Sequence, residues 1–252
     1  MSLYAGGVNL RHRGGGWLLR EVELRLQAGQ LHALIGPNGA GKTSLLRLLA
    51  GDLASDPPVL LDGRPLQRWA PIALARRRAV FSQHDVLRFD FTAAEVVGLG
   101  RLPWRTPADA DATAAALAAV GAEPLATRPY TELSGGERAR VRLARALAQI
   151  WPVQALPPRF LLLDEPLAHL DFAFRQRCLQ LLRNLSAAGA GVLLVLHEPE
   201  LAAAWADRVT LLGCGEVVAQ GPAAVLTPSV LSRAYGVPIA RHNGLWHVES
   251  QC

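Results

Sequence analysis

Lysine is almost absent from this chain of 252 residues, which contains 26 lysine and arginine residues in total. Arginine fills every one of these positions except one, and the single lysine, Lys42, lies within a glycine-rich stretch. A compact ammonium acts as a point charge toward phosphate, whereas the planar guanidinium of arginine does not. A lysine kept at this one place therefore indicates a local requirement for such a charge.

Long hydrophobic runs are also missing, although 50% of the residues are hydrophobic. Runs such as Val192–Leu196 end after a few positions, whereas a membrane-spanning helix needs ~20 apolar residues. The first residues contain no uninterrupted apolar segment, so we expect no secretory signal. The three cysteines, Cys178, Cys214 and Cys252, are odd in number and lack metal-ligand spacing, which argues against a disulfide framework. We expect a protein that is soluble by itself and cytoplasmic.

Charge of one sign does not cluster strongly, despite a formal net charge of +5. The only tight basic run is Arg76–Arg78, and a solvated helix face explains it better than a nucleic-acid site. We therefore expect no nucleic-acid partner. The length suits a single core, or a core that carries one large insertion.

Buried strands alternate with helical patterns along much of the chain. The apolar runs Leu31–Ile35, Phe160–Leu163 and Val192–Leu196 are each followed by a predicted helix. Such an alternation predicts an α/β fold with a mostly parallel sheet covered on both faces. The tail returns to short strands over Arg208–Ala219 and to a predicted hairpin over Pro238–Glu249.

No apolar strand appears between Gln83 and Arg140, where the pattern is helical. Helices are predicted near Thr92–Arg101, Ala108–Val120 and Gly135–Gln149. This stretch is interpreted as a helical insertion into the α/β core.

A glycine-rich loop directly follows the first buried strand and opens a helix, which is the context of a phosphate-binding loop. A simple glycine-rich turn would need neither the lysine nor the hydroxyl at this spacing. Backbone N–H groups and the helix N-terminus would attract phosphate, Lys42 would reach the β and γ phosphates, and the Thr43 hydroxyl would bind magnesium. The candidate nucleotide-binding residues here are Gly36, Pro37, Asn38, Gly39, Ala40, Gly41, Lys42, Thr43 and Ser44.

Two adjacent carboxylates, Asp164 and Glu165, end the strand Phe160–Leu163. Side chains alternate along a strand, so the two acids can have different roles. Asp164 would hold magnesium and Glu165 would act as general base toward the attacking water. A strand can also end in acids merely because it reaches solvent, but the phosphate-binding loop makes the catalytic interpretation the better one.

The sequence Leu133-Ser134-Gly135-Gly136-Glu137 predicts a helix start, with Ser134 and Glu137 forming a capping box. A serine-capped helix N-terminus with two glycines is also an exposed anion site. Here the chain resembles the ATP-binding cassette (ABC) family, whose signature is this motif. The resemblance implies that Ser134, Gly135 and Gly136 close over the γ phosphate held by a second cassette, so that the protein acts as a homodimer.

Further landmarks of that family follow in order. The resemblance implies that Gln83 contacts magnesium and the attacking water, that Asp171 lies in a loop crossing between subunits, and that His197 bonds the γ phosphate. A lone glutamine or histidine at a strand end is usually structural. Their position in the ordered set favours the catalytic roles of Glu165, His197 and Gln83, with magnesium held by Thr43, Gln83 and Asp164.

The sequence departs from the family pattern at two places. The family stacks an aromatic residue on adenine shortly after the first strand, where this chain has Arg11 and His12; either side chain is a candidate for stacking. The histidine at position 197 is followed by Glu198 instead of the commoner aspartate, a change we expect to be tolerated.

The implied fold is a P-loop NTPase core of ABC ATPase type with a helical insertion subdomain. Residues 1–82 and 150–225 would form the core with an N-terminal β subdomain, 83–149 the helical signature subdomain, and 226–252 a C-terminal extension. ATP and Mg²⁺ are the implied substrate and cofactor.

Within the family the chain is most similar to ATPases of haem, cobalamin and iron-siderophore importers. The haem importers are favoured by Arg88–Thr92, by Leu147–Trp151 and by Ala234-Tyr235-Gly236-Val237. The resemblance implies an ATPase at the cytoplasmic face of the bacterial inner membrane, with two permease subunits and, indirectly, a periplasmic substrate-binding protein. Cobalamin or siderophore import is the alternative. A soluble cassette ATPase acting on ribosomes or DNA is disfavoured, because only one cassette and no heptad pattern is present.

Overall fold

Five consecutive buried residues, Leu31–Ile35, form β3 of a six-stranded main sheet in the computed structural model, which describes residues 1–12, 14–82, 90–104, 106, 109–152, 157–168, 170–242 and 245–248. The strand order is β10-β9-β3-β8-β7-β6, and only β10 runs antiparallel to its neighbour. The other strands of this sheet are β6 (Arg78–Phe81), β7 (Phe160–Leu163), β8 (Gly191–Val195), β9 (Arg208–Gly213) and β10 (Glu216–Gly221).

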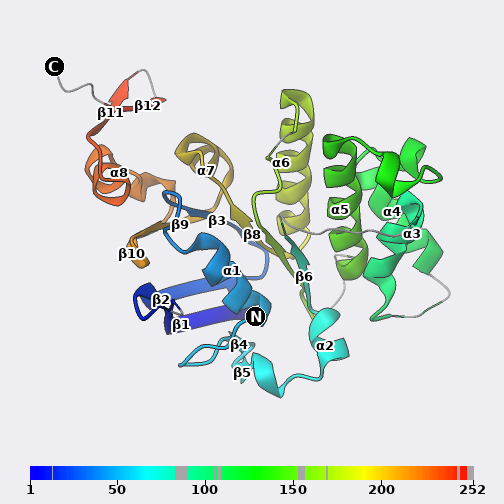
Figure 1. Ribbon diagram of the computed structural model, residues 1–252, viewed down its shortest axis with the longest axis horizontal. Coiled ribbons are helices and arrows are strands. Elements are labelled where there is room, and N and C mark those ends of the chain that lie inside the picture. Colours follow the sequence, from blue (N-terminus) through cyan, green and yellow to red (C-terminus); the bar gives the residue numbers. More distant parts are fainter. Residues whose placement is uncertain are drawn as a thin grey trace.

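Helices connect these strands and cover the sheet (Figure 1). The α-helices of the described residues are α1 (Lys42–Ala50), α2 (Pro71–Ala75), α3 (Ala93–Gly98), α4 (Asp109–Ala119), α5 (Gly135–Ile150), α6 (Phe172–Ala187), α7 (Pro199–Trp205) and α8 (Pro228–Tyr235). Short 3-10 helices lie at Leu66–Arg68, Leu99–Arg101, Glu123–Leu125, Tyr130–Glu132 and Ala223–Val225. The predicted α/β fold with a mostly parallel sheet is confirmed.

The main sheet separates two hydrophobic cores, because alternate side chains of a strand point to opposite faces. On β7, Leu161 and Leu163 pack into the core that holds the helices α5 and α6, whereas Phe160 and Leu162 pack into the core that holds α1. All four side chains are fully buried. A strand that is buried on both faces has a continuous run of apolar residues, and this run is the pattern that predicted β7 from the sequence.

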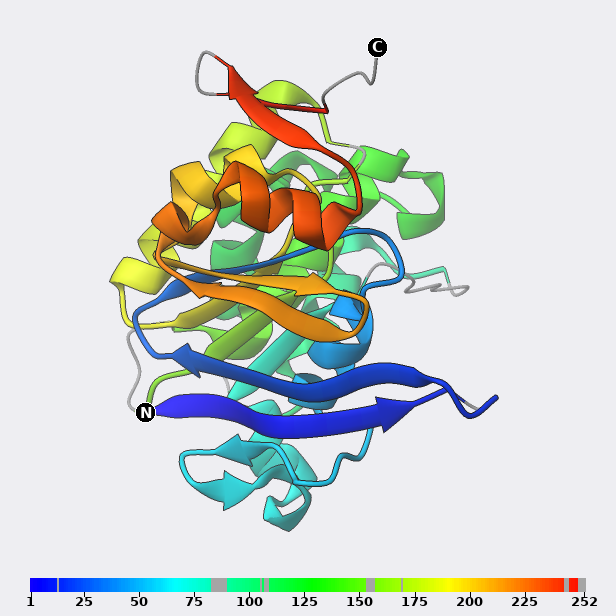
Figure 2. The ribbon, with the colours of Figure 1, turned by 90° about the vertical axis from the view of Figure 1, so that its left-hand side faces the viewer.

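A second sheet covers the other side of α1. Its order is β2-β1-β4-β5, and its strands are β1 (Ser2–Arg11), β2 (Trp17–Gln27), β4 (Leu60–Leu61) and β5 (Arg64–Pro65). All of its pairings are antiparallel. Figure 2 shows β1 and β2 as a separate layer beneath β9 and β10.

The helices α3, α4 and α5 gather at one end of the molecule, on the right of Figure 1. The carboxyl end of α5 is anchored there by side-chain donors. The carbonyl groups of residues 148–150 accept hydrogen bonds from Arg101 Nη1 (2.7 Å), Trp104 Nε1 (2.8 Å) and Arg159 Nη1 (2.7 Å). Carbonyls at a helix end have no partner within the helix, so these donors hold α5 against the strand β7 that follows Arg159.

The tail folds onto the main sheet. After β10 come α8 and the antiparallel hairpin of β11 (Ile239–His242) and β12 (Leu245–Val248). The predicted hairpin is confirmed, while its expected turn at residues 243–244 lies outside the described residues. Among the residues described, no helix has the length and apolar character needed to span a bilayer.

Candidate functional site

The loop between β3 and α1 approaches neighbouring backbone too closely for side chains at two of its glycines. A Cβ on Gly36 would lie 2.3 Å from the carbonyl oxygen of Leu212. Gly41 has φ 95°, and a Cβ there would lie 2.9 Å from the carbonyl oxygen of Leu18. Both positions therefore require glycine. The predicted loop lies at the carboxyl end of a parallel strand and leads into a helix, which is the arrangement of an anion site.

Lys42 opens α1 and is buried, with its side chain folded over the loop. Its Nζ donates hydrogen bonds to the carbonyl oxygens of Gly36 (2.8 Å) and Pro37 (3.0 Å). Burial lowers the pKa of Lys42, and the carboxylates of Glu165 and Asp164 act against that shift. The only lysine of the chain thus sits as a positive charge within the loop.

Thr43, in the first turn of α1, and Asp164, directly after β7, meet at the edge of the main sheet where the parallel strands end. The Thr43 hydroxyl donates to Asp164 Oδ1 across 3.3 Å, and Asp164 is buried. A hydroxyl and a carboxylate are hard oxygen ligands of the kind that Mg²⁺ prefers. The two side chains therefore fit the magnesium role expected for them, with phosphate oxygens as further ligands. In the described part of the chain, no cluster of three or more His, Cys, Asp or Glu forms a metal site.

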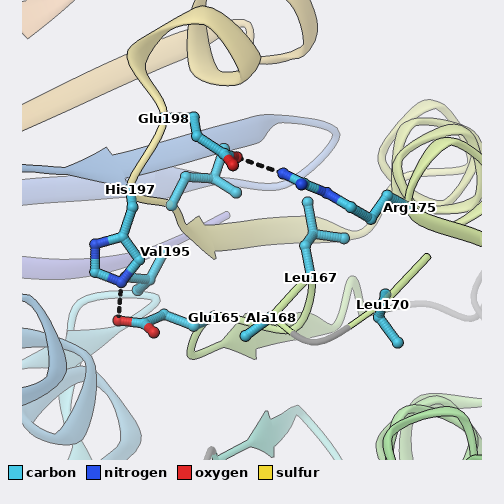
Figure 3. A pocket seen from close by; sticks show the side chains of 9 residues that line it. Glu165, Leu167, Ala168, Leu170, Arg175, Val195, His197 and Glu198 are labelled. Atoms are coloured by element: carbon cyan, nitrogen blue, oxygen red, sulfur yellow. Dashed lines mark hydrogen bonds and ion pairs between the residues drawn. The ribbon is translucent and has the colours of Figure 1, made fainter. Parts of the chain in front are cut away.

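Glu165 and His197 face one another at the ends of β7 and β8 (Figure 3). His197 Nε2 lies 2.5 Å from Glu165 Oε1. Glu165 also has φ 51°, in the left-handed region that side chains other than glycine rarely occupy. Strained backbone of this kind persists where the surrounding structure imposes it, often at functional sites.

Glu165 lines two neighbouring cavities. One, of about 190 Å³, is lined by Leu18, Asn38, Gly39, Gly41, Lys42, Thr43, Ser44 and Glu165. The other, of about 250 Å³, is lined by Glu165, Leu167, Ala168, Leu170, Arg175, Val195, Leu196, His197 and Glu198. The glutamate thus stands between the glycine-rich loop and the histidine, as a general base between phosphate and histidine would.

The loop after β8 has an ion pair next to the histidine. Glu198 Oε2 lies 2.5 Å from Arg175 Nη2 of α6, which Figure 3 also shows. The glutamate at this position, which departs from the family pattern, therefore has a cationic partner in α6. This ion pair connects the loop to α6 and does not involve the His197 ring.

The predicted capping box at the start of α5 is confirmed. Ser134 Oγ accepts from the Glu137 N–H (3.3 Å), and Glu137 Oε2 accepts from the Ser134 N–H (2.8 Å). Hydrogen bonds to its carboxylate from the backbone and the side chain of Ser134 lower the pKa of Glu137. Ser134 and Gly135 are exposed, and outside the helix's own first turns no atom of the described residues lies within 4 Å of where a Gly135 side chain would begin. The start of this helix is open to an incoming group.

The structure does not bring this motif to the glycine-rich loop of the same chain. α5 packs with α6 on one face of the main sheet, whereas α1, which follows the glycine-rich loop, packs on the opposite face. Asp171 caps α6 by accepting from the Phe174 N–H (2.8 Å), and Phe172 beside it is 77% exposed. Gln83, the remaining predicted catalytic residue, lies outside the described residues.

The stacking candidates Arg11 and His12 lie at the end of β1 and are exposed. Sequence reasoning missed Trp17, which pairs with Arg11 across the β1–β2 ladder and is 46% exposed. The Arg11 guanidinium lies 4.1 Å from the centroid of the indole ring. Trp17 directly precedes Leu18, which lines the cavity of the glycine-rich loop. Knowledge of the antiparallel register, which pairs Trp17 with Arg11, would have identified this residue.

Sequence comparison gives matches over most of the chain. A family model described as ABC transporter matches residues 19–168. The hemin import ATP-binding protein HmuV of Nocardia farcinica is 47% identical over 249 residues, covering 95% of this chain and 84% of that protein. The protein of the same name from Roseobacter denitrificans is 44% identical over 238 residues, covering 94% and 91%.

Solved structures show the same fold. One is an ABC transporter described as of the metal-chelate type in an inward-facing conformation, with a TM-score of 0.77, 23% identity, and coverage of 98% of this chain and 96% of that one. Another is a dimeric ATP-binding cassette in a post-hydrolysis state bound to ADP and phosphate, with a TM-score of 0.77, 23% identity, and coverage of 88% and 99%. At this level of identity the likeness concerns the fold alone.

Proposed function

Because this chain belongs to the ABC transporter family, we propose that it hydrolyses ATP to power the import of haem through a membrane permease. The observation that carries the catalytic part is the position of Glu165, which lines the cavity of the phosphate loop and contacts His197. A carboxylate there can take a proton from water attacking a phosphate held by the loop.

In this proposal the loop residues Gly36–Ser44 bind the phosphates of ATP through backbone N–H groups and Lys42. Thr43 and Asp164 would hold Mg²⁺, which when bound neutralises charge on the phosphate oxygens. The water oxygen forms a bond to the γ phosphorus while the bond to the leaving oxygen of ADP breaks. Glu165 accepts the proton of that water, and His197 keeps the carboxylate and the γ phosphate in place.

We assign adenine stacking to Trp17, with Arg11 on the indole, in place of His12. Stacked rings and guanidinium planes offer a flat apolar surface to a base. The 4.1 Å separation between the Arg11 guanidinium and the indole centroid supports this assignment. Trp17 is also next in sequence to Leu18, which lines the phosphate cavity.

The protein would act as a homodimer. Ser134, Gly135 and Gly136 lie at the start of α5, which packs in a different core from α1. This arrangement supports a role for them at the nucleotide of a second copy. Asp171 and the exposed Phe172 would lie where the two copies meet. An uncovered aromatic side chain of this size is typical of a contact surface.

The permease would bind a groove beside α2 and the α3–α4 region. A cavity of about 520 Å³ is lined by Ile72, Arg76, Leu102 and Trp104 among others, and Leu102 also lines a cavity of about 490 Å³ with Ala94 and Gly98. Ile72 and Leu102 are exposed. The groove includes Ala94 and Gly98 of α3 and extends to α2. Apolar grooves of this kind suit an amphipathic helix, here a cytoplasmic helix of the permease.

Haem is proposed as the cargo because the curated relatives named above are hemin import ATP-binding proteins. Cobalamin or a ferric siderophore is the alternative, and a periplasmic binding protein would deliver any of them. The ATPase would lie at the cytoplasmic face of the bacterial inner membrane. No residue of this chain is assigned to haem, because cargo recognition would belong to the other subunits.

The test is ATP turnover of the chain reconstituted with its permease. Binding proteins loaded with haem, cobalamin or a siderophore are added one at a time. Stimulation by the haem-loaded protein alone would support the cargo, and stimulation by another would replace it. If ribosomes or DNA changed the rate and no loaded partner did, the transporter role would be wrong.

A further inference from the structure

The loop that carries His197 contacts the C-terminal part of the chain. The His197 side chain is 45% exposed, so packing alone does not fix its position. Its backbone carbonyl accepts a hydrogen bond from the Tyr235 hydroxyl, with 3.5 Å between the oxygens. Tyr235 is the last residue of α8 and belongs to the Ala234–Val237 motif, which the proposed function leaves without a role.

Tyr235 belongs to a helix, α8, that is anchored to the rest of the protein. Leu231 of α8 is fully buried and Ala234 is nearly so. Both belong to the same hydrophobic core as α5 and α6. Arg233 Nη2 donates to the carbonyl oxygen of Val218 on β10 (2.8 Å). Gly236 caps the carboxyl end of the helix, with a φ of 71° that suits glycine. Because α8 is held on the main sheet, the Tyr235 ring has little freedom to follow the loop.

The hairpin of the tail supports the same segment from a second side. The backbone N–H of Trp246 donates to Glu200 Oε1 (3.2 Å), three residues after His197. The hairpin is itself tied to α8, since the Ile239 N–H donates to Ser232 Oγ (2.8 Å). The residues from His197 to Glu200 are therefore held by both parts of the tail.

The Tyr235 hydroxyl stays protonated over the working range of the protein. Burial raises the pKa of Tyr235 to about 12, and the negative charge of Glu200 acts in the same direction. A protonated phenol can donate to a carbonyl, whereas a phenolate cannot.

We infer that Tyr235 is a positioning residue, whose hydroxyl sets the backbone of His197 and thereby the imidazole that contacts Glu165. The inference rests on the proposed roles of His197 and Glu165 in ATP hydrolysis. At 3.5 Å the bond is long, and catalytic hydrogen bonds often shorten in the reacting complex. Its effect therefore falls on turnover and not on ATP binding, which belongs to the Gly36–Ser44 loop.

The experiment compares Tyr235→Phe with the wild-type full chain in steady-state ATP hydrolysis. We expect kcat to fall roughly two- to fivefold, as for the loss of one neutral hydrogen bond, with KM for ATP unchanged. Tyr4→Phe is the matched control, because it removes a hydroxyl that donates to Glu23 in the N-terminal sheet (3.1 Å). The control should leave kcat unchanged.

A double-mutant cycle distinguishes positioning from a structural effect. In a His197→Ala background the Tyr235→Phe change should have no further effect on residual turnover, and an equal loss there would overturn the inference. The inference would also be overturned if Tyr235→Phe lowered Tm and raised KM. It would be overturned as well if the kcat of Tyr235→Phe equalled that of an active wild type. A wild-type chain without ATPase activity would instead overturn the proposed function, and this inference with it.

Discussion

His197 Nε2 lies 2.5 Å from Glu165 Oε1, and this contact joins the ends of two adjacent strands of the main sheet. Glu165 takes part in it from a left-handed backbone conformation, at a cost of about 1–3 kcal/mol that the rest of the fold must offset. The pair thus places a carboxylate, in a disfavoured local conformation, between the phosphate loop and an imidazole.

Replacement of Glu165 by glutamine should abolish hydrolysis and leave ATP binding intact. The amide keeps the size of the side chain but cannot accept a proton, and a general base contributes about 10²–10⁴-fold. We expect kcat to fall by at least ~100-fold, with an ATP-bound dimer trapped on size-exclusion chromatography. Glu216→Gln, which removes an exposed partner of Arg20, is the control. Near-normal turnover of Glu165→Gln would remove Glu165 from the role of base.

The sequence predicted elements wherever a short-range pattern was decisive. The strands Leu31–Ile35 and Phe160–Leu163 have the predicted bounds, and the predicted strand Val192–Leu196 lies one residue earlier, at Gly191–Val195. Its shift is a matter of hydrogen bonding, because apolar character alone does not show where the ladder with β3 and β7 begins.

Contacts between residues distant in sequence were beyond such patterns. The stacking of Arg11 on Trp17 depends on the register of β1 and β2, which includes irregularities at the end of the ladder. The bond from Tyr235 to His197 depends on how α8 packs on the main sheet. Neither contact follows from spacing along the chain. The sequence therefore suggested Arg11 and His12, and not Trp17, as candidates for stacking on adenine.

Trp17→Ala should weaken ATP binding more than His12→Ala does. Stacking of a base on an aromatic ring contributes about 1–3 kcal/mol, which corresponds to a rise in Kd of roughly 5- to 150-fold. Binding of inorganic triphosphate should not change, because it has no base to stack. Equilibrium binding of both ligands to both variants measures the difference. A larger loss of ATP affinity in His12→Ala would return adenine to His12.

Leu102→Asp should prevent assembly with the permease while the free chain still hydrolyses ATP. Leu102 is 57% exposed and lines both cavities of the proposed groove, so a carboxylate there would be buried against the docked helix. Leu245→Asp, at a leucine that is 54% exposed on the tail hairpin, is the matched control. Co-purification with the permease measures the outcome. Equal recovery of permease with both variants would place the docking surface elsewhere.

Acid should destabilise the fold through His32, a fully buried residue of β3. Its Nε2 is hydrogen-bonded to Thr210 Oγ1 (2.8 Å). Burial lowers the pKa of His32 from 6.5 to about 4, and the charge of Arg208 acts in the same direction. The unfolded chain therefore binds a proton at a higher pH than the folded one does. The stabilising contribution is complete above pH 6.5 and is lost as the pH falls toward 4.

The size of this effect follows from the separation of the two pKa values, since each unit corresponds to about 1.4 kcal/mol. The free energy of unfolding should fall by about 3 kcal/mol more in the wild type than in His32→Gln between pH 7 and pH 4. Glutamine retains a group that can bond Thr210 but does not titrate in this range. Urea unfolding at a series of pH values measures both slopes, and the carboxylates common to the two proteins cancel in the difference. Parallel slopes would show that His32 does not couple protonation to unfolding.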